Sequence, residues 1–149
     1  MKLGQSLQIN TDNIRIREFM MAGQKLRVRV PLAAEMELIS KAVDDAEWQS
    51  KFDSLKKPFI EDAGGKVEET ADDVIVDGRS LKELAIMSAK TEARIVQMVR
   101  LLVPAEEGFD MAQISYADIE AEFPFSVQLE LMKKIAEVIS PGYEESRKN

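Results

Sequence analysis

The side chains that could do chemistry in this chain are carboxylates. Cysteine and histidine are both absent, which excludes disulfides, thiolate nucleophiles, imidazole bases and zinc sites built from these ligands. Asp118 and Glu122 would lie one helical turn apart, where two carboxylates can share a metal ion or a proton. Nothing nearby completes such a site, so we predict no catalytic, metal-binding or cofactor-binding residue and no enzymatic activity. A small enzyme in which Asp118, Glu120 or Glu122 converges with another acid on a metal ion stays open as an alternative.

Sites for phosphate are also missing from the sequence. Gly64-Gly65-Lys66 lacks the preceding strand, the upstream glycine and the following Ser or Thr of a phosphate-binding loop. The 20 Lys and Arg residues against 27 Asp and Glu residues give a net charge of −7. This charge opposes nucleic-acid binding, because neutralising phosphates requires a basic face that dominates the field. We therefore predict protein partners and no nucleic acid.

Four arginines are concentrated in one short region. Arg15 and Arg17 alternate with isoleucines, and Arg27 and Arg29 alternate with other apolar residues. Like charges that face each other across a hairpin repel, so the pattern is unusual unless something else uses it. Two interpretations stay open: the arginines bind an acidic surface of a partner, or they pair with the chain's own excess carboxylates. RNA binding is disfavoured, because no aromatic side chain is interleaved to stack on bases.

Methionine is abundant, with eight residues in the chain. Its flexible side chain suits surfaces that accept more than one partner, and it also fills cores. Met36 and Met98 lie on predicted buried stripes, whereas Met20 and Met21 would lie at a hairpin tip, outside the core. The candidate partner-binding residues are therefore Arg15, Arg17, Arg27, Arg29, Met20 and Met21.

A β-hairpin over residues 14–30 would carry these candidates. The residues on both sides of Gly23 alternate with a period of two, and Gly23 can supply the positive φ of a short hairpin loop. All four arginines would share one face. Glu18-Phe19 breaks the alternation, which predicts a bulge or an early strand end. The apolar face would consist of Ile14, Ile16, Leu26, Val28 and Val30.

Helices are predicted for most of the remaining chain. Pro31 suits the first position of a helix that ends near Asp45. A short helix follows and is interrupted by Pro58. Capping-box spacing at Ser80 begins a long, central helix that Pro104 stops.

Two more helices complete the C-terminal part. A short helix begins after Ser115, and Pro124 begins the last helix. Residues 1–13 are predicted to be a loose lead-in, and residues 142–149 a polar tail. The acidic segment 61–73 is predicted to be exposed and flexible, and it precedes a short strand at Val74-Ile75-Val76.

Length and composition bound the architecture. At 149 residues one domain is the default, so we predict a single domain over residues 1–149. The fold class is α+β and mostly helical: an N-terminal β-hairpin followed by about four helices packed around a long central helix. No apolar run approaches the roughly 18 residues of a membrane span, and the start of the chain lacks a secretory signal. We expect a cytoplasmic protein without membrane contact, whose exposed strand edges allow homo-oligomers.

Two stretches of the chain resemble a known family. They are IRIREFMMAGQKLRVRVPLAAEMELISKA and YADIEAEFPFSVQLELMKKIAEVISPGYEE. A basic-apolar strand ends in Val-Pro before an acidic helix in the first, and IEAEFP leads into a final helix in the second. In these features the sequence resembles the tail assembly chaperones of long-tailed bacteriophages.

The resemblance implies a small, acidic, non-enzymatic protein in the cytoplasm of the infected host. It would bind the tape measure protein, assist the tail tube protein during assembly, need no cofactor, and be absent from the finished particle. No family motif defines the residues of the binding surface. The alternative is a structural head–tail connector or tail completion component that is retained in the virion.

Overall fold

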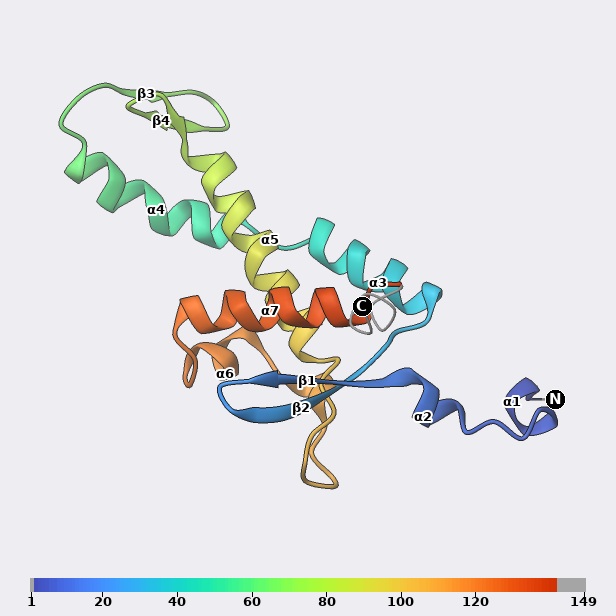
Figure 1. Ribbon diagram of the computed structural model, residues 1–149. Coiled ribbons are helices and arrows are strands. Elements are labelled where there is room, and N and C mark those ends of the chain that lie inside the picture. Colours follow the sequence, from blue (N-terminus) through green and yellow to red (C-terminus); the bar gives the residue numbers. More distant parts are fainter. Residues whose placement is uncertain (1, 142–149) are drawn as a thin grey trace. The chain divides into compact units, whose positions relative to one another are not determined.

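The computed structural model describes residues 2–141 and shows an α+β, mostly helical chain (Figure 1), which confirms the predicted fold class. The chain forms two compact units. We call residues 2–38 and 95–141 the hairpin unit, and residues 39–94, which interrupt it in the sequence, the inserted unit. The single domain stays a prediction. The predicted polar tail, residues 142–149, lies outside the described residues.

The hairpin unit contains the predicted hairpin. Strand β1 (Ile16–Met21) pairs antiparallel with β2 (Gln24–Arg29). Ala22 and Gly23 form the turn with φ values of 52° and 77°, as expected for a two-residue loop that follows the strand twist. The register is continuous from Ile16 to Met21, so the predicted bulge at Glu18-Phe19 is wrong.

The start of the hairpin also differs from the prediction. Ile14 and Arg15 belong to a short helix, α2 (Thr11–Arg15), which follows another short helix, α1 (Leu3–Ser6). Residues 3–6 and 11–13 of the predicted lead-in are therefore helical, and none of residues 3–6 is buried. Pairing across the hairpin extends beyond Ile16 by one bond, from the N–H of Val30 to the carbonyl of Arg15 (2.6 Å).

The faces of β1 are the reverse of those predicted, whereas Leu26 and Val28 of β2 lie on the inner face as predicted. Phe19 and Met21 are buried, and Arg17 lies on their face because side chains two residues apart point the same way. In the register, Phe19 lies opposite Leu26 and Arg17 lies opposite Val28. The prediction counted the alternation from Ile14, which lies in helix α2. It therefore assigned the side chains of β1 to the wrong faces.

A third segment pairs with the outer edge of β2. The N–H of Arg29 donates to the carbonyl of Leu101 (2.9 Å), and the N–H of Val103 donates to the carbonyl of Arg27 (2.8 Å). Helix α5 (Leu81–Val99) consequently ends before the predicted stop at Pro104. Helical periodicity assigned residues 101–103 to the last turn of this helix, but they pair with the outer edge of β2. This pairing satisfies backbone groups that would otherwise face solvent.

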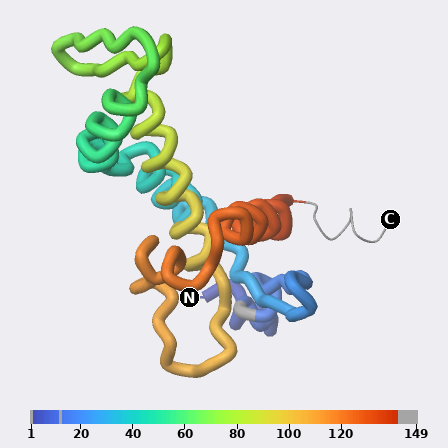
Figure 2. Tube along the Cα trace, turned by 90° about the vertical axis from the view of Figure 1, so that its left-hand side faces the viewer, coloured from blue at the N-terminus to red at the C-terminus, as the bar shows by residue number. Residues whose placement is uncertain are grey.

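Helix α7 (Phe125–Ile139) lies against both strands of the hairpin (Figure 1). It follows a 3₁₀ turn, η1 (Met111–Gln113), and the short helix α6 (Tyr116–Glu120). Figure 2 shows the connection from α5 to α6 as a long loop, drawn in light orange. The final helix and the short helix after Ser115 were both predicted. The buried residues of this unit are Phe19, Met21, Val28, Ile95, Val96, Met98, Val99, Leu101, Ile119, Gln128, Leu131, Ile135 and Val138.

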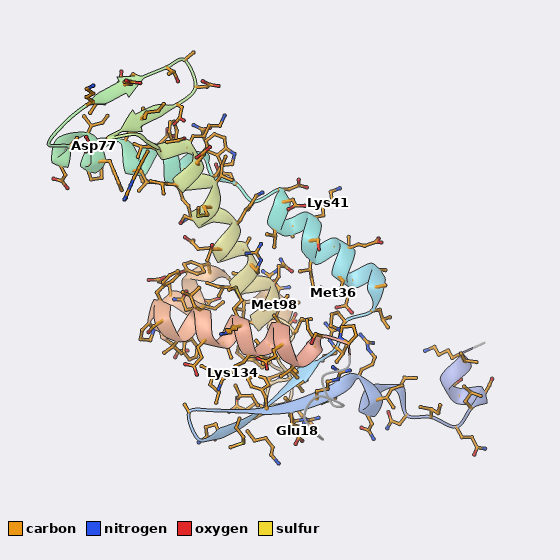
Figure 3. The ribbon with its side chains drawn as sticks, turned by 45° about the horizontal axis from the view of Figure 1, so that its top comes forward. Glu18, Met36, Lys41, Asp77, Met98 and Lys134 are labelled. Carbon is orange, nitrogen blue, oxygen red and sulfur yellow. The ribbon has the colours of Figure 1, made fainter. Side chains whose placement is uncertain are left out.

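The inserted unit has a small core of its own. Helix α4 (Gln49–Asp62) and the sheet β3 (Val67–Glu69), β4 (Val74–Val76), β5 (Arg79–Ser80) surround it together with the first part of α5. The buried residues of this core are Phe52, Val74, Val76, Leu81 and Ala85. The predicted strand at 74–76 is confirmed. Figure 3 marks Asp77, which with Gly78 turns β4 into β5 at φ values of 51° and 80°.

Three boundaries in this part of the chain correct the predictions. Helix α3 (Ala33–Asp44) begins two residues after Pro31, because the first helical bond runs from Met36 to Leu32. Helix α4 continues through Pro58, which removes one hydrogen bond without ending the helix. Within the acidic segment 61–73, residues 67–69 form strand β3, paired with β4. The flexibility of that segment stays a prediction.

Candidate protein-binding site

Two of the candidate arginines are held by one glutamate of the same chain. The guanidinium groups of Arg15 and Arg29 donate to Glu35 Oε1 at 3.1 and 2.7 Å, and Arg15 also donates to the carbonyl of Val30. The hydrogen bond from Arg29 is the main reason why the pKa of Glu35 lies below its usual value. For these two residues the structure shows the second of the two interpretations, pairing with the chain's own carboxylates.

Arg17 is part of the packing between the hairpin and the last helix. Its Nη1 donates to the carbonyls of Val138 (2.6 Å) and Ser140 (3.0 Å) at the end of α7. The last carbonyls of a helix have no partner within the helix, so a cation there satisfies both hydrogen bonding and the helix dipole. We therefore interpret Arg17 as a structural residue.

Arg27 lies on the other face of the hairpin, which is exposed. Arg27 lies opposite Glu18 in the register of the two strands. Glu18 forms an ion pair with Lys25 (3.4 Å). Figure 3 marks Glu18 on β1 and Lys134 on α7. The four arginines thus do not form one basic surface, and their role in partner binding stays a prediction.

The two candidate methionines separate in the same way. Met20 is 54% exposed, and its carbonyl accepts a hydrogen bond from Lys134 Nζ (3.2 Å). Met21 is only 9% exposed, which corrects the expectation that both lie outside the core. Its buried side chain lines a groove, described below.

Replacing Arg17 with alanine is expected to lower the free energy of unfolding by about 2 kcal/mol, since hydrogen bonds from charged groups are worth roughly 1.5–3 kcal/mol. The measurement is chemical unfolding in urea. Arg27→Ala is the matched control and should change stability by less than about 0.5 kcal/mol, as is usual for an exposed residue. Equal losses in the two variants would contradict the role assigned to Arg17.

Replacing Glu35 with glutamine is expected to lower stability by about 1 kcal/mol at neutral pH, because water screens ion pairs of a side chain that is 35% exposed. The folded-state pKa of Glu35 is lowered, so the stabilisation is present above the usual glutamate pKa and is lost as pH falls through the folded value. Unfolding curves of both proteins in stepwise acidified buffer should converge. A difference that persists in acid would contradict this assignment.

An apolar groove of about 950 Å³ lies within the hairpin unit. Its buried floor is formed by Met21, Val99, Ile119 and Leu131, from four different elements. The remaining apolar lining comes from the tip of the hairpin, the loop before α6 and the start of α7: Ala22, Leu26, Leu102, Phe109, Met111, Ile114, Ala121, Phe123 and Val127. The groove therefore exists only where these segments meet.

Two aromatic side chains stand exposed at this groove. Phe109 is 54% and Phe123 is 40% exposed, and aromatic side chains contribute more than most to the energy of protein interfaces. Neither residue was among those predicted to bind a partner. An available signal was the position of Phe109 in a polar loop that follows Glu106-Glu107-Gly108.

The charged side chains that line the groove are all acidic: Asp110, Asp118 and Glu122. Asp110 accepts the N–H of Ala112, and Asp118 accepts the N–H and the hydroxyl of Ser115 in a capping box. The backbone bond from Ser115 is the largest cause of the lowered pKa of Asp118, so this carboxylate stays ionised. Asp118 and Glu122, singled out by their spacing, thus lie at the same groove.

Gln128 joins the two helices that form one wall of the groove. Its side chain is fully buried: Oε1 accepts the hydroxyl of Tyr116 (2.7 Å), and Nε2 donates to the carbonyl of Phe123 (2.8 Å). Because a carbonyl oxygen can only accept a hydrogen bond, the NH2 end of the Gln128 side chain must face Phe123. The network fixes α6 against the start of α7 and thereby positions Phe123.

In the range 2–141, no three acidic side chains gather closely enough to hold a metal ion. No helix within it combines the length and the apolar character that crossing a bilayer requires. The chain matches no protein-family model, no curated protein and no solved structure.

Proposed function

We propose that this chain is a non-enzymatic phage tail assembly chaperone, which binds the tape measure protein and assists assembly of the tail tube. The observation that carries the proposal is the open apolar groove of the hairpin unit, with exposed Phe109 and Phe123 beside it. Exposed apolar surface that is rimmed by polar residues is typical of protein-binding sites. The resemblance of the two sequence stretches to tail assembly chaperones supplies the identity of the partners.

The lining of the groove supports reversible protein binding. Met21 and Met111 contribute flexible, polarisable side chains, which adapt to more than one apolar partner segment. A chaperone that is absent from the finished particle needs such adaptability, because it must bind its client and then leave. The protein would act in the cytoplasm of the infected host, before the tail is complete.

The proposal is tested by affinity capture of the tagged chain from phage-infected cells. Bound proteins are identified by mass spectrometry, and purified virions are probed for the chain with an antibody. We expect recovery of the tape measure protein, together with the tail tube protein, and no chain in the virions. A chain that captures neither protein and remains in purified particles would contradict the proposal and favour a structural head–tail connector or tail completion component.

A further inference from the structure

We propose that the occupant of the groove is an amphipathic helix that carries lysine or arginine beside its apolar face. This inference rests on the proposed function and deepens it, because it states which segments of a client the groove selects.

The floor and the rim of the groove have different chemistry. Met21, Val99, Ile119 and Leu131 form a buried floor, whereas the lining carboxylates are exposed. A site for a small molecule normally places a few polar groups where they converge on the ligand. Here the polar groups stand at the solvent edge of the groove. The matching ligand is therefore apolar on the face that lies in the groove and charged along the flanks that lie at its solvent edge.

The sign of the rim charge selects a basic ligand. Asp110, Asp118 and Glu122 line the groove, and every other lining residue is uncharged. The hydrogen bonds from Ser115 lower the pKa of Asp118 and so favour its charged form. Complementary rim charges steer association and exclude partners of like charge. A second copy of this chain, with its net charge of −7, fits such a rim poorly.

The backbone around the groove favours a helix over an added strand. Of the lining residues only Met21, the last residue of β1, and Gln24 and Leu26 of β2 lie on strands, and the outer edge of β2 already pairs with residues 101–103. An added strand needs a row of open backbone donors and acceptors, whereas a helix satisfies its own and binds through side chains at spacings of three and four.

The test uses the full chain and three synthetic helical peptides in isothermal titration calorimetry. The first has Leu and Met along one face and Lys at the flanking positions, the second replaces each Lys with Glu, and the third scrambles the first. We expect the Lys peptide to bind at least about 10-fold more tightly than the Glu peptide at low salt. The ratio should fall as salt is added, because exposed charges are screened.

A charge reversal at the rim gives the matched comparison. Glu122 is the appropriate position, because Asp110 and Asp118 also cap backbone groups. Glu122→Lys should weaken binding of the Lys peptide by about 5-fold and strengthen that of the Glu peptide. Glu137→Lys, at an exposed position on α7 outside the groove, should change neither.

Two results would overturn the inference. Equal binding of the Lys and Glu peptides, or equal effects of Glu122→Lys and Glu137→Lys, would show that the groove does not select a basic helix. A stable dimer in sedimentation that Phe123→Ser dissociates would show that a second copy occupies the groove. Neither result removes the proposed function, which fails separately if the tape measure protein is not captured from infected cells.

Discussion

Replacing Gln128 with alanine is expected to lower the free energy of unfolding by about 3 kcal/mol, one of the largest effects of any single substitution in the hairpin unit. The change removes a fully buried side chain: the carbonyl of Phe123 loses its Nε2 donor, and Tyr116 and Glu120 each lose one hydrogen bond. A stranded buried polar group costs roughly 1–3 kcal/mol, and the cavity adds to this. Urea unfolding of the two proteins measures the difference.

A double-mutant cycle separates the hydrogen bond from the cavity. Tyr116→Phe removes only the hydroxyl that Gln128 accepts and should cost about 1 kcal/mol. In the Gln128→Ala background the same change should cost much less, because its partner is already gone. Additive losses would show that the two side chains do not interact. A loss below about 0.5 kcal/mol for Gln128→Ala would contradict the structural role of the network.

The second large effect concerns binding. Replacing Phe109 and Phe123 together with serine is expected to weaken binding of the tape measure protein by about 100-fold, because exposed aromatic anchors dominate interface energies. Both side chains are substantially exposed, so the melting temperature of the chain should change little. The measurement is a titration of purified tape measure protein into each form of the chain.

The matched control removes two exposed apolar side chains from other places. Leu3 is 70% and Met87 is 62% exposed, and neither lines the groove. Leu3→Ser with Met87→Ser should leave the affinity within about twofold of the unchanged chain, as is usual away from hot spots. If this control weakens binding as much as the groove variant does, general apolar surface and not the groove holds the partner.

The sequence predicted those elements whose signals are local. The hairpin turn at Gly23, the helix start after Ser115 and the final helix after Pro124 are each encoded within a few residues and were predicted. The errors arose where a distant segment decides the local conformation. Residues 101–103 continue a helical pattern, yet the open edge of β2 pairs with Leu101 and Val103 and ends the helix early.

The candidate site was harder to predict for the same reason. The arginines formed an obvious local pattern, but Glu35 and the end of α7, both outside the hairpin, decide what three of them do. The groove brings together residues from 21 to 131, and no local pattern marks such a set. Spacing did single out Asp118 and Glu122, although for a metal or a proton and not for the rim of a groove.

The chain's own methionines can report whether the groove of the hairpin unit binds the tape measure protein. Methyl NMR of the chain, labelled with ¹³C at the methionine methyl groups and assigned by single Met→Leu variants, reports on each position separately. Met21 and Met111 line the groove, whereas Met36 and Met87 do not. On addition of purified tape measure protein we expect the signals of Met21 and Met111 to shift or broaden while those of Met36 and Met87 stay in place. Unchanged groove signals in the presence of a bound partner, or changes confined to Met36 and Met87, would contradict the account.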